Sequence, residues 1–316
     1  MKDFRPIPWW DQIDLPRFPA LRHSLDVDAV IVGGGLTGIT AALLLKEAGC
    51  RVALVERGRV GGIDTGCTTA HLTPVVDASL TDLASTLGQD HAQAVWDAGW
   101  AAINQIDELV ERFDIDCDFA WVPGFFHADV DADEKVLARD DQRIRAEVAL
   151  AESLGFDVSF ISEAPFVGTP AMRVEHQAKF HPRKYLRGLL TRLRHVGCEV
   201  FEESEAEIGD DGVKVGSHTV RAPWVVVATH NPLQGHQNFL QASLLQTKLA
   251  LYTSYVVRAP LRGPHPEPYE AALFWDTHSP YHYLRLDNVD GETFAIAGGA
   301  DHKTGQVDDP ARCYTE

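Results

Sequence analysis

Three glycines and one glutamate have the residue types and the spacing that bind a pyrophosphate and a ribose. Gly33, Gly35 and Gly38 form a Gly-x-Gly-x-x-Gly pattern, and Glu56 follows about 20 residues further along the chain. In this pattern the first glycine allows a tight turn, the second lets the backbone approach the phosphates, and the third lets a helix pack closely on a strand. A carboxylate at Glu56 can accept hydrogen bonds from ribose hydroxyls. The four residues therefore predict a site for the ADP half of a dinucleotide.

The segments around these residues have the patterns needed to hold them in place. Residues 28–32 and 51–55 each begin with a charged residue, Asp28 or Arg51, and continue as an apolar run rich in β-branched residues, typical of a buried parallel strand. Between them, 36–48 predict a helix whose N-terminal N–H groups and positive dipole end face the phosphates. Strand, glycine turn, helix, strand and acid in this order make a purely structural glycine-rich turn the weaker interpretation.

The residues after Glu56 distinguish between two dinucleotides. Glu56 disfavours a 2′-phosphate by repulsion, although Arg57 and Arg59 weaken that argument. An NAD-binding domain usually continues with regular strand–helix alternation, whereas here a loop of small residues, 61–69, follows and can contact a flat ligand through its backbone. Later the apolar strand 224–228 returns to the same site. These features favour FAD and leave an NAD-dependent dehydrogenase as the alternative.

The rest of the chain predicts an α/β protein with a second domain. Helical periodicity covers 91–113 and 133–154, and a further helix begins at Pro182 and ends at Gly197. Residues 240–300 alternate between apolar and polar types, as in an antiparallel sheet. The expected fold is a Rossmann-like parallel sheet of the FAD/NAD(P)-binding type with an antiparallel crossover meander, plus a mixed or antiparallel substrate domain. The expected parts are an N-terminal arm at 1–26, a discontinuous FAD-binding domain at 27–116 and 178–239, and a substrate domain at 117–177 and 240–316, incomplete at the C-terminus.

Composition excludes several classes of partner. The net charge of −18 opposes binding to nucleic acid or to an anionic membrane surface. The five cysteines are scattered and odd in number, which favours a reducing compartment over a disulfide framework. No signal peptide and no membrane-spanning stretch are recognisable. A cytoplasmic protein with a small-molecule substrate is therefore expected.

Five blocks of sequence resemble a known family of flavoproteins. They are residues 66–73, 177–186, 228–232, 281–285 and 298–305. Together with the glycine motif, they resemble the D-amino-acid oxidase-like, or glycine/sarcosine oxidase-like, FAD-dependent oxidoreductases, and above all the bacterial branch that usually carries a C-terminal Rieske iron–sulfur domain. The resemblance implies FAD as the cofactor and an amine or amino acid as the substrate. It further implies that the C–H bond next to the substrate nitrogen gives a hydride to flavin N5, for an electron acceptor that the sequence does not identify.

Two features depart from the family pattern. His230 stands where many FAD enzymes have a glycine. The chain ends at Glu316, before the segment that in the family approaches the pyrimidine edge of the flavin, and no Cys-x-His paired with Cys-x-x-His offers ligands for a Rieske cluster. The second interpretation is therefore a truncated flavin-binding module with little or no catalytic turnover.

The resemblance assigns cofactor contacts to the glycine motif, the small-residue loop and the returning strand. It implies that the motif and Glu56 hold ADP, and that the loop holds the pyrophosphate and the flavin. Backbone near Glu202 is a further expected neighbour of the adenine. The predicted cofactor-binding residues are Gly33, Gly35, Leu36, Thr37, Gly38, Glu56, Arg57, Gly61, Gly62, Gly66, Thr68, Thr69 and Thr229.

One strand offers candidate substrate contacts. The two-residue period of a strand places Tyr281, Tyr283 and Arg285 on one face, where an arginine between phenols can hold a carboxylate in a bidentate manner. The alternative is an arginine that is solvent-exposed or salt-bridged within the sheet. His127 and Trp275 are weaker candidates for the same cavity.

Two further chemistries are not expected. His278 and His282 are four residues apart, but Pro280 lies between them and no helix is predicted there, so their imidazoles are not expected to converge on a metal ion. Some relatives attach flavin covalently through His or Cys, and Cys67 and His71 raise that question. In the sarcosine-type pattern the linking histidine would fall at Ala70, so non-covalent FAD is expected.

Overall fold

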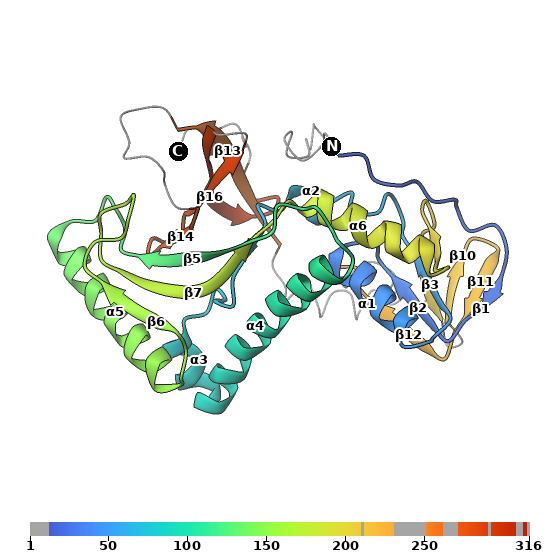
Figure 1. The fold of residues 1–316 in the computed structure, drawn as a ribbon, viewed down its shortest axis with the longest axis horizontal. Helices are drawn as coiled ribbons and strands as arrows, with labels where there is room; N and C mark the ends of the chain where they lie inside the picture. Colours follow the sequence, from blue (N-terminus) through green and yellow to red (C-terminus); the bar gives the residue numbers. More distant parts are fainter. Residues whose placement is uncertain are drawn as a thin grey trace. The chain divides into compact units, whose positions relative to one another are not determined.

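The computed structural model divides the chain into two compact units (Figure 1). The first unit comprises Met1–Thr68, Leu109–Cys117 and His181–Ala250. The second comprises Thr69–Glu108, Asp118–Phe180 and Leu251–Glu316. The structure describes residues 13–209, 212–230, 251–261, 271–289, 292–307 and 312–314.

The first unit is built on a parallel sheet with the strand order β12-β2-β3-β8. Strands β2 and β3 are buried along their whole length because their side chains are apolar and have neighbours on both faces. Helices α1 and α6 lie side by side in this unit (Figure 1). The bounds are β2 Ala29–Val32, α1 Leu36–Glu47, β3 Val52–Val55, α2 Asp64–Cys67, α6 Pro182–His195, β8 Glu199–Phe201 and β12 Trp224–Val227.

A smaller sheet in the first unit has the order β1-β11-β10-β9. Its strands are β1 Leu25–Asp26, β9 Glu207–Gly209, β10 Gly212–Val215 and β11 His218–Arg221. Val213 and Val220 of this sheet share a buried cluster with Val30 and Val55 of the parallel sheet. The meander therefore covers apolar side chains of the parallel sheet, and the predicted fold class is confirmed.

The second unit is built on a mixed, eight-stranded sheet with the order β13-β16-β15-β14-β5-β7-β4, and β6 pairs with β7. Its pairings are antiparallel except that β14 runs parallel to β5. Of the predicted strand region, 240–250, 262–270, 290 and 291 lie outside the described residues. The strands are β4 His71–Leu72, β5 Ala120–His127, β6 Val158–Ile161, β7 Ala171–Lys179, β13 Tyr252–Pro260, β14 Leu273–Asp276, β15 Tyr283–Val289 and β16 Glu292–Lys303.

The second unit begins earlier in the chain than expected, and the packing of its helices explains why. The sequence prediction assigns 69–108 to the FAD-binding domain, whereas this stretch belongs to the second unit. Trp96 is fully buried in a cluster with Ile144 and Val174, and this packing attaches the stretch to the sheet. The helices are α3 Leu80–Leu87, α4 Gln89–Arg112, whose last residues fall in the first unit, and α5 Glu134–Ser153.

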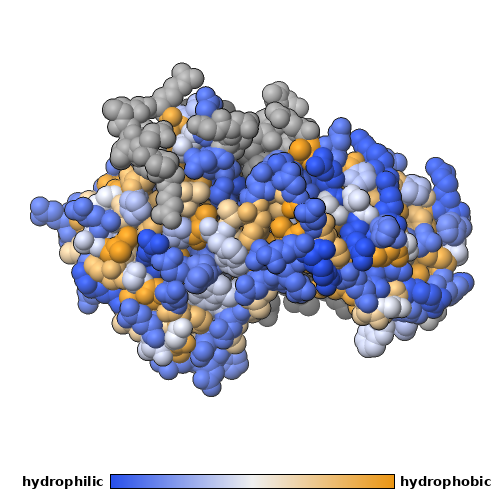
Figure 2. Space-filling model, viewed as in Figure 1, coloured by the Kyte–Doolittle hydropathy of each residue, from blue (hydrophilic) through white to orange (hydrophobic). Residues whose placement is uncertain are grey.

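Hydrophilic side chains cover most of the face shown in Figure 2, and hydrophobic ones are scattered among them. No helix among the described residues is long and apolar enough to cross a membrane.

Candidate functional site

The glycine turn of the first unit is sterically closed to side chains. Gly33 has φ +113°, and a Cβ added there would lie 2.3 Å from the carbonyl oxygen of Ala228, at the end of β12. A Cβ on Gly38 would lie 2.0 Å from the carbonyl oxygen of Gly33. The first and third glycines of the motif therefore allow the turn, α1 and β12 to approach one another, as their spacing predicts.

The N-terminus of α1 is suited to an anion. Gly35 precedes the helix and offers no side-chain cap, and the first turn contains no acidic residue. The N–H of Leu36 donates to Oγ1 of Thr65 at 3.2 Å. Because the first N–H groups of a helix lack partners within the helix and carry partial positive charge, this end favours a phosphate.

Glu56 lies beside the glycine turn, just after β3. Its Oε2 accepts the N–H of Gly34 at 2.7 Å, and its Oε1 accepts the N–H of Gly58 at 2.8 Å. The N–H of Ser204 donates to the backbone carbonyl of Glu56 at 2.9 Å. Each carboxylate oxygen keeps a further lone pair, so the group remains able to accept from ribose hydroxyls.

A cleft of about 440 Å³ in the first unit collects these groups. Nine of the predicted cofactor-binding residues line it: Gly33, Gly35, Leu36, Thr37, Glu56, Arg57, Gly61, Gly62 and Thr229. The sequence analysis did not single out Thr65 of α2 or Ala206, which line it as well. These two are found only once the fold brings α2 and the segment after β8 to the glycine turn.

The other four predicted residues do not line the cleft. Gly38 supports helix packing, and a Cβ on Gly66 would lie 2.7 Å from the carbonyl oxygen of Gly61, so Gly66 allows the loop to fold back on itself. Thr68 ends the first unit and Thr69 begins the second. Thr69 Oγ1 lies 3.0 Å from Nδ1 of His71.

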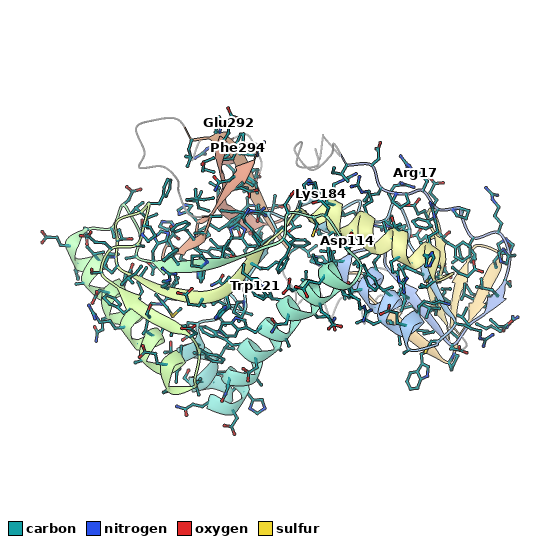
Figure 3. All side chains as sticks on the ribbon, viewed as in Figure 1. Arg17, Asp114, Trp121, Lys184, Glu292 and Phe294 are labelled. Carbon is teal, nitrogen blue, oxygen red and sulfur yellow. The ribbon has the colours of Figure 1, made fainter. Side chains whose placement is uncertain are left out.

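A buried carboxylate beside the cleft has a structural role that the sequence did not show. Glu202 is 1% exposed, accepts the N–H of Phe18 at 3.0 Å and of Val60 at 2.9 Å, and forms an ion pair with Arg59. Arg17, labelled in Figure 3, lies in the same N-terminal segment, and its carbonyl accepts from Arg194 of α6 at 2.8 Å. Glu202 thus connects the N-terminal segment to the loop that lines the cleft.

The predicted tyrosines lie together in the second unit. The ring centroids of Tyr281 and Tyr283 are 6.2 Å apart. The Tyr281 hydroxyl donates to Asp77 Oδ1 at 3.3 Å, and the Tyr283 hydroxyl lies 2.9 Å from Ser254 Oγ. Burial raises the pKa of both phenols, and the carboxylates of Asp77 and Asp301 raise the pKa of Tyr281 further. Both hydroxyls are therefore neutral hydrogen-bond donors at physiological pH.

Arg285 lies on β15 two residues after Tyr283, but its surroundings differ from those expected. Its side chain is 1% exposed. Nη1 lies 2.9 Å from the carbonyl oxygen of Thr69 and 3.0 Å from that of Phe180, and Nη2 lies 3.0 Å from Asp287 Oδ2. A guanidinium enclosed in this way is poorly placed to clamp a substrate carboxylate, so the predicted substrate contact at Arg285 gives way to the alternative of an arginine salt-bridged within the sheet.

His71 is neutral under ordinary conditions. Burial and the positive charge of Arg285 lower its pKa to about 4. Its ring meets that of Tyr283 edge to face, with centroids 5.5 Å apart. His71 therefore adds a polar but uncharged group beside the tyrosines.

The weaker candidates lie on neighbouring strands of the same sheet, where Trp275 of β14 pairs with Tyr283 of β15 and His127 ends the adjacent strand β5. His127 is 6% exposed, its Nδ1 lies 2.8 Å from the carbonyl oxygen of Ala128, and Trp275 stacks on Phe126 with centroids 6.1 Å apart. Contrary to the expectation from sequence, the rings of His278 and His282 do converge, with centroids 4.8 Å apart. Within the part of the chain that the structure describes, no group of three or more His, Cys, Asp or Glu side chains is arranged to hold a metal ion.

Comparison with known proteins extends these observations. A family model described as "FAD dependent oxidoreductase" (DAO) matches residues 28–314. A Bacillus subtilis protein named for a Rieske 2Fe-2S iron–sulfur protein, YhfW, is 29% identical over 305 residues, which cover 94% of this chain and 57% of that protein. Gamma-glutamylputrescine oxidoreductase from Escherichia coli is 31% identical over 102 residues, which cover 32% of this chain and 24% of the enzyme. The chain thus spans little more than half the length of the first of these relatives.

Solved structures show the same fold. Glycine oxidase from Geobacillus kaustophilus superposes with a TM-score of 0.59 at 17% identity, covering 90% of this chain and 74% of the oxidase. L-proline dehydrogenase from P. horikoshii superposes with a TM-score of 0.60 at 16% identity, covering 92% of this chain and 73% of the dehydrogenase.

Proposed function

Because the chain belongs to the DAO family of FAD-dependent oxidoreductases, we propose that it binds FAD without a covalent bond and oxidises an amine or amino acid. The observation that carries this proposal is the cleft of the first unit, where the glycine turn, the N-terminus of α1 and Glu56 meet. The space that a Cβ at Gly33 would fill is closed by backbone, so the turn is shaped to present N–H groups. These groups fit the ADP half of FAD.

Each part of the cleft has a separate task in this proposal. The N–H groups at the start of α1 hold the pyrophosphate, and Glu56 accepts from the ribose. Thr68 and Thr69, at the end of the small-residue loop, contact the flavin end of the cofactor. When bound, the flavin supplies the hydride acceptor for the C–H bond next to the substrate nitrogen.

The second unit supplies the substrate contacts in this proposal. The neutral hydroxyl of Tyr283 donates a hydrogen bond that orients a polar group of the substrate, while the Tyr281 hydroxyl, whose proton goes to Asp77, accepts a hydrogen bond from the amine. His71, also neutral, limits the positive charge beside them, which keeps a cationic amine from being repelled there. The electron acceptor is a separate molecule that these residues do not specify.

One observation favours a second candidate, a flavin-binding module with little turnover. The side chain of Arg285, the predicted clamp for a substrate carboxylate, is 1% exposed and paired with Asp287 within the second unit.

Two measurements test both candidates. Titration of the purified protein with FAD, followed by flavin absorbance and fluorescence, is expected to show saturable binding, and absence of binding would overturn both proposals. Anaerobic mixing of the FAD complex with amino acids, N-methyl amino acids and diamines is expected to bleach the flavin with at least one of them. Binding without bleaching by any of these amines would support the inactive module instead.

A further inference from the structure

The second unit contains a buried cation whose hydrogen bonds go mainly to the backbone. The Arg285 side chain is 1% exposed. Its Nη1 lies 2.9 Å, 3.3 Å and 3.0 Å from the carbonyl oxygens of Thr69, Ala70 and Phe180. Arginine suits this arrangement because its planar guanidinium presents several donors in fixed directions.

A carboxylate and a lysine hold the guanidinium in place. Asp287 Oδ2 accepts from Arg285 Nη2 at 3.0 Å, and Asp287 Oδ1 is ion-paired with Lys179. Lys179 and Asp287 are each less than a tenth exposed. Buried charges persist only when they are paired and hydrogen-bonded, so this cluster fixes the position of Arg285 strongly.

The backbone that Arg285 contacts is strained. Ala70 has φ +57°, a left-handed conformation that residues with a Cβ rarely adopt. The carbonyl before this residue, from Thr69, and its own carbonyl both approach Nη1. Such strain persists only where surrounding contacts impose it, and it is found most often at functional sites. Arg285 is one source of such contacts, through the carbonyls of Thr69 and Ala70.

The three carbonyls also have a common place in the chain. Thr69 and Ala70 are the first residues after the chain first leaves the first unit, and Phe180 is the last residue before its second return, at His181. Thr69 is also the last residue of loop 61–69, whose earlier part, from Gly61 to Thr65, lines the cofactor cleft. The Arg285 guanidinium therefore contacts the backbone at two of the places where the chain passes from one unit to the other, Thr69–Ala70 and Phe180.

We propose that Arg285 is a positioning residue for FAD, which fixes the turn at Thr69–Ala70 so that the end of loop 61–69 is held in the conformation that contacts the flavin. This inference rests on the proposed function, because it requires that Thr68 and Thr69 contact the flavin end of the cofactor. ADP needs only the cleft of the first unit, so its binding does not depend on Arg285.

A comparison of FAD binding with ADP binding distinguishes a positioning role of Arg285 from a merely structural one, because only FAD carries the flavin. Arg285→Met removes the donors at similar volume. Arg285→Lys keeps the charge, but its single nitrogen cannot contact the carbonyls and Asp287 at once, as Nη1 and Nη2 of the guanidinium do. Glu147→Gln is the matched control: Glu147 is 2% exposed and its carboxylate accepts the N–H groups of Leu80, at 2.9 Å, and of Thr81, at the start of α3. The control weakens the second unit without disturbing the turn.

The experiment compares the dissociation constants of FAD and ADP for the four proteins by calorimetry at one temperature. We expect Arg285→Met and Arg285→Lys to weaken FAD binding about tenfold relative to ADP binding, whereas Glu147→Gln leaves the ratio of the two constants unchanged. An unchanged ratio in both Arg285 variants would overturn the inference. A wild-type protein that binds FAD no more tightly than ADP would instead refute the flavin contact assumed under the proposed function.

Hydrogen exchange of the wild-type protein provides a second measurement if the Arg285 variants do not fold. FAD is expected to slow amide exchange at residues 70–72 more than ADP does, since the flavin end of the cofactor adds contacts to the preceding loop. Equal exchange with the two ligands would contradict the proposed coupling between the turn and the flavin.

Discussion

Replacing Gly33 by alanine tests whether close approach of two backbone segments shapes the cofactor cleft. The substitution adds a Cβ 2.3 Å from the carbonyl oxygen of Ala228 at a residue with φ +113°. The positive φ costs about 1–2 kcal/mol for a residue with a Cβ. The overlap costs a further 1–3 kcal/mol or so, because the end of β12 or the turn must shift. We expect Gly33→Ala to lower the free energy of unfolding by about 2–5 kcal/mol.

Gly49 provides a matched control in the same unit. It has φ +89°, and a Cβ there would have nothing within 4 Å, so Gly49→Ala is expected to lose only the conformational part, about 1–2 kcal/mol. Urea unfolding of the three proteins measures both losses, and FAD titration is expected to show weaker binding in Gly33→Ala alone. Equal losses of stability, together with unchanged FAD affinity in Gly33→Ala, would refute the close-approach argument.

Three further predictions concern buried or cleft-lining charged and titratable groups. Glu56→Gln, measured by FAD titration, is expected to weaken binding about tenfold because the carboxylate accepts charge-assisted hydrogen bonds. Glu202→Gln is expected to lower the free energy of unfolding by about 1–3 kcal/mol, because the buried carboxylate accepts the N–H groups of Phe18 and Val60 in charged hydrogen bonds, and proteolysis should then cut the N-terminal segment faster. Because the pKa of His71 is lowered to about 4 from 6.5, the unfolded chain binds the proton more tightly. Stability is therefore expected to be retained above pH 6.5 and to fall by up to about 3 kcal/mol as the pH drops toward 4, a slope that urea unfolding should show reduced in His71→Asn.

The local order of the cofactor motif could be predicted because its signals lie close together in the sequence. Residues 28–32, the glycines and the helix after them each follow from backbone rules that act over a few positions. The structure has a strand, a turn and a helix at these places, with boundaries that differ by one residue. Most of the predicted cofactor residues line the cleft for the same reason.

The surroundings of Arg285 could not be predicted in the same way. Alternation along a strand indicates which residues share a face, and Tyr283 and Arg285 do follow each other at that spacing. It does not indicate what covers that face. Thr69 and Phe180 reach the guanidinium from more than 100 residues away in the chain, so only the tertiary fold reveals that it is enclosed.

Helix α3 was missed for a different reason. Its eight residues span about two turns, too few for a clear helical period. Ser79 accepts the N–H of Asp82 and so begins the helix, and Gly88 follows its last residue. These two end signals, rather than a helical period, mark the helix in the sequence.

The parallel pairing of β2 with β12 determines when the first unit can fold during synthesis. Ala29 pairs with Trp224, so β2 has β3 as an early neighbour but waits for about 200 more residues before its other edge is covered. At a ribosomal rate of about 5–20 residues per second, that edge stays open for about 10–40 seconds. An exposed, apolar strand edge of this kind recruits other chains, so newly made protein is expected to depend on chaperones until β12 emerges.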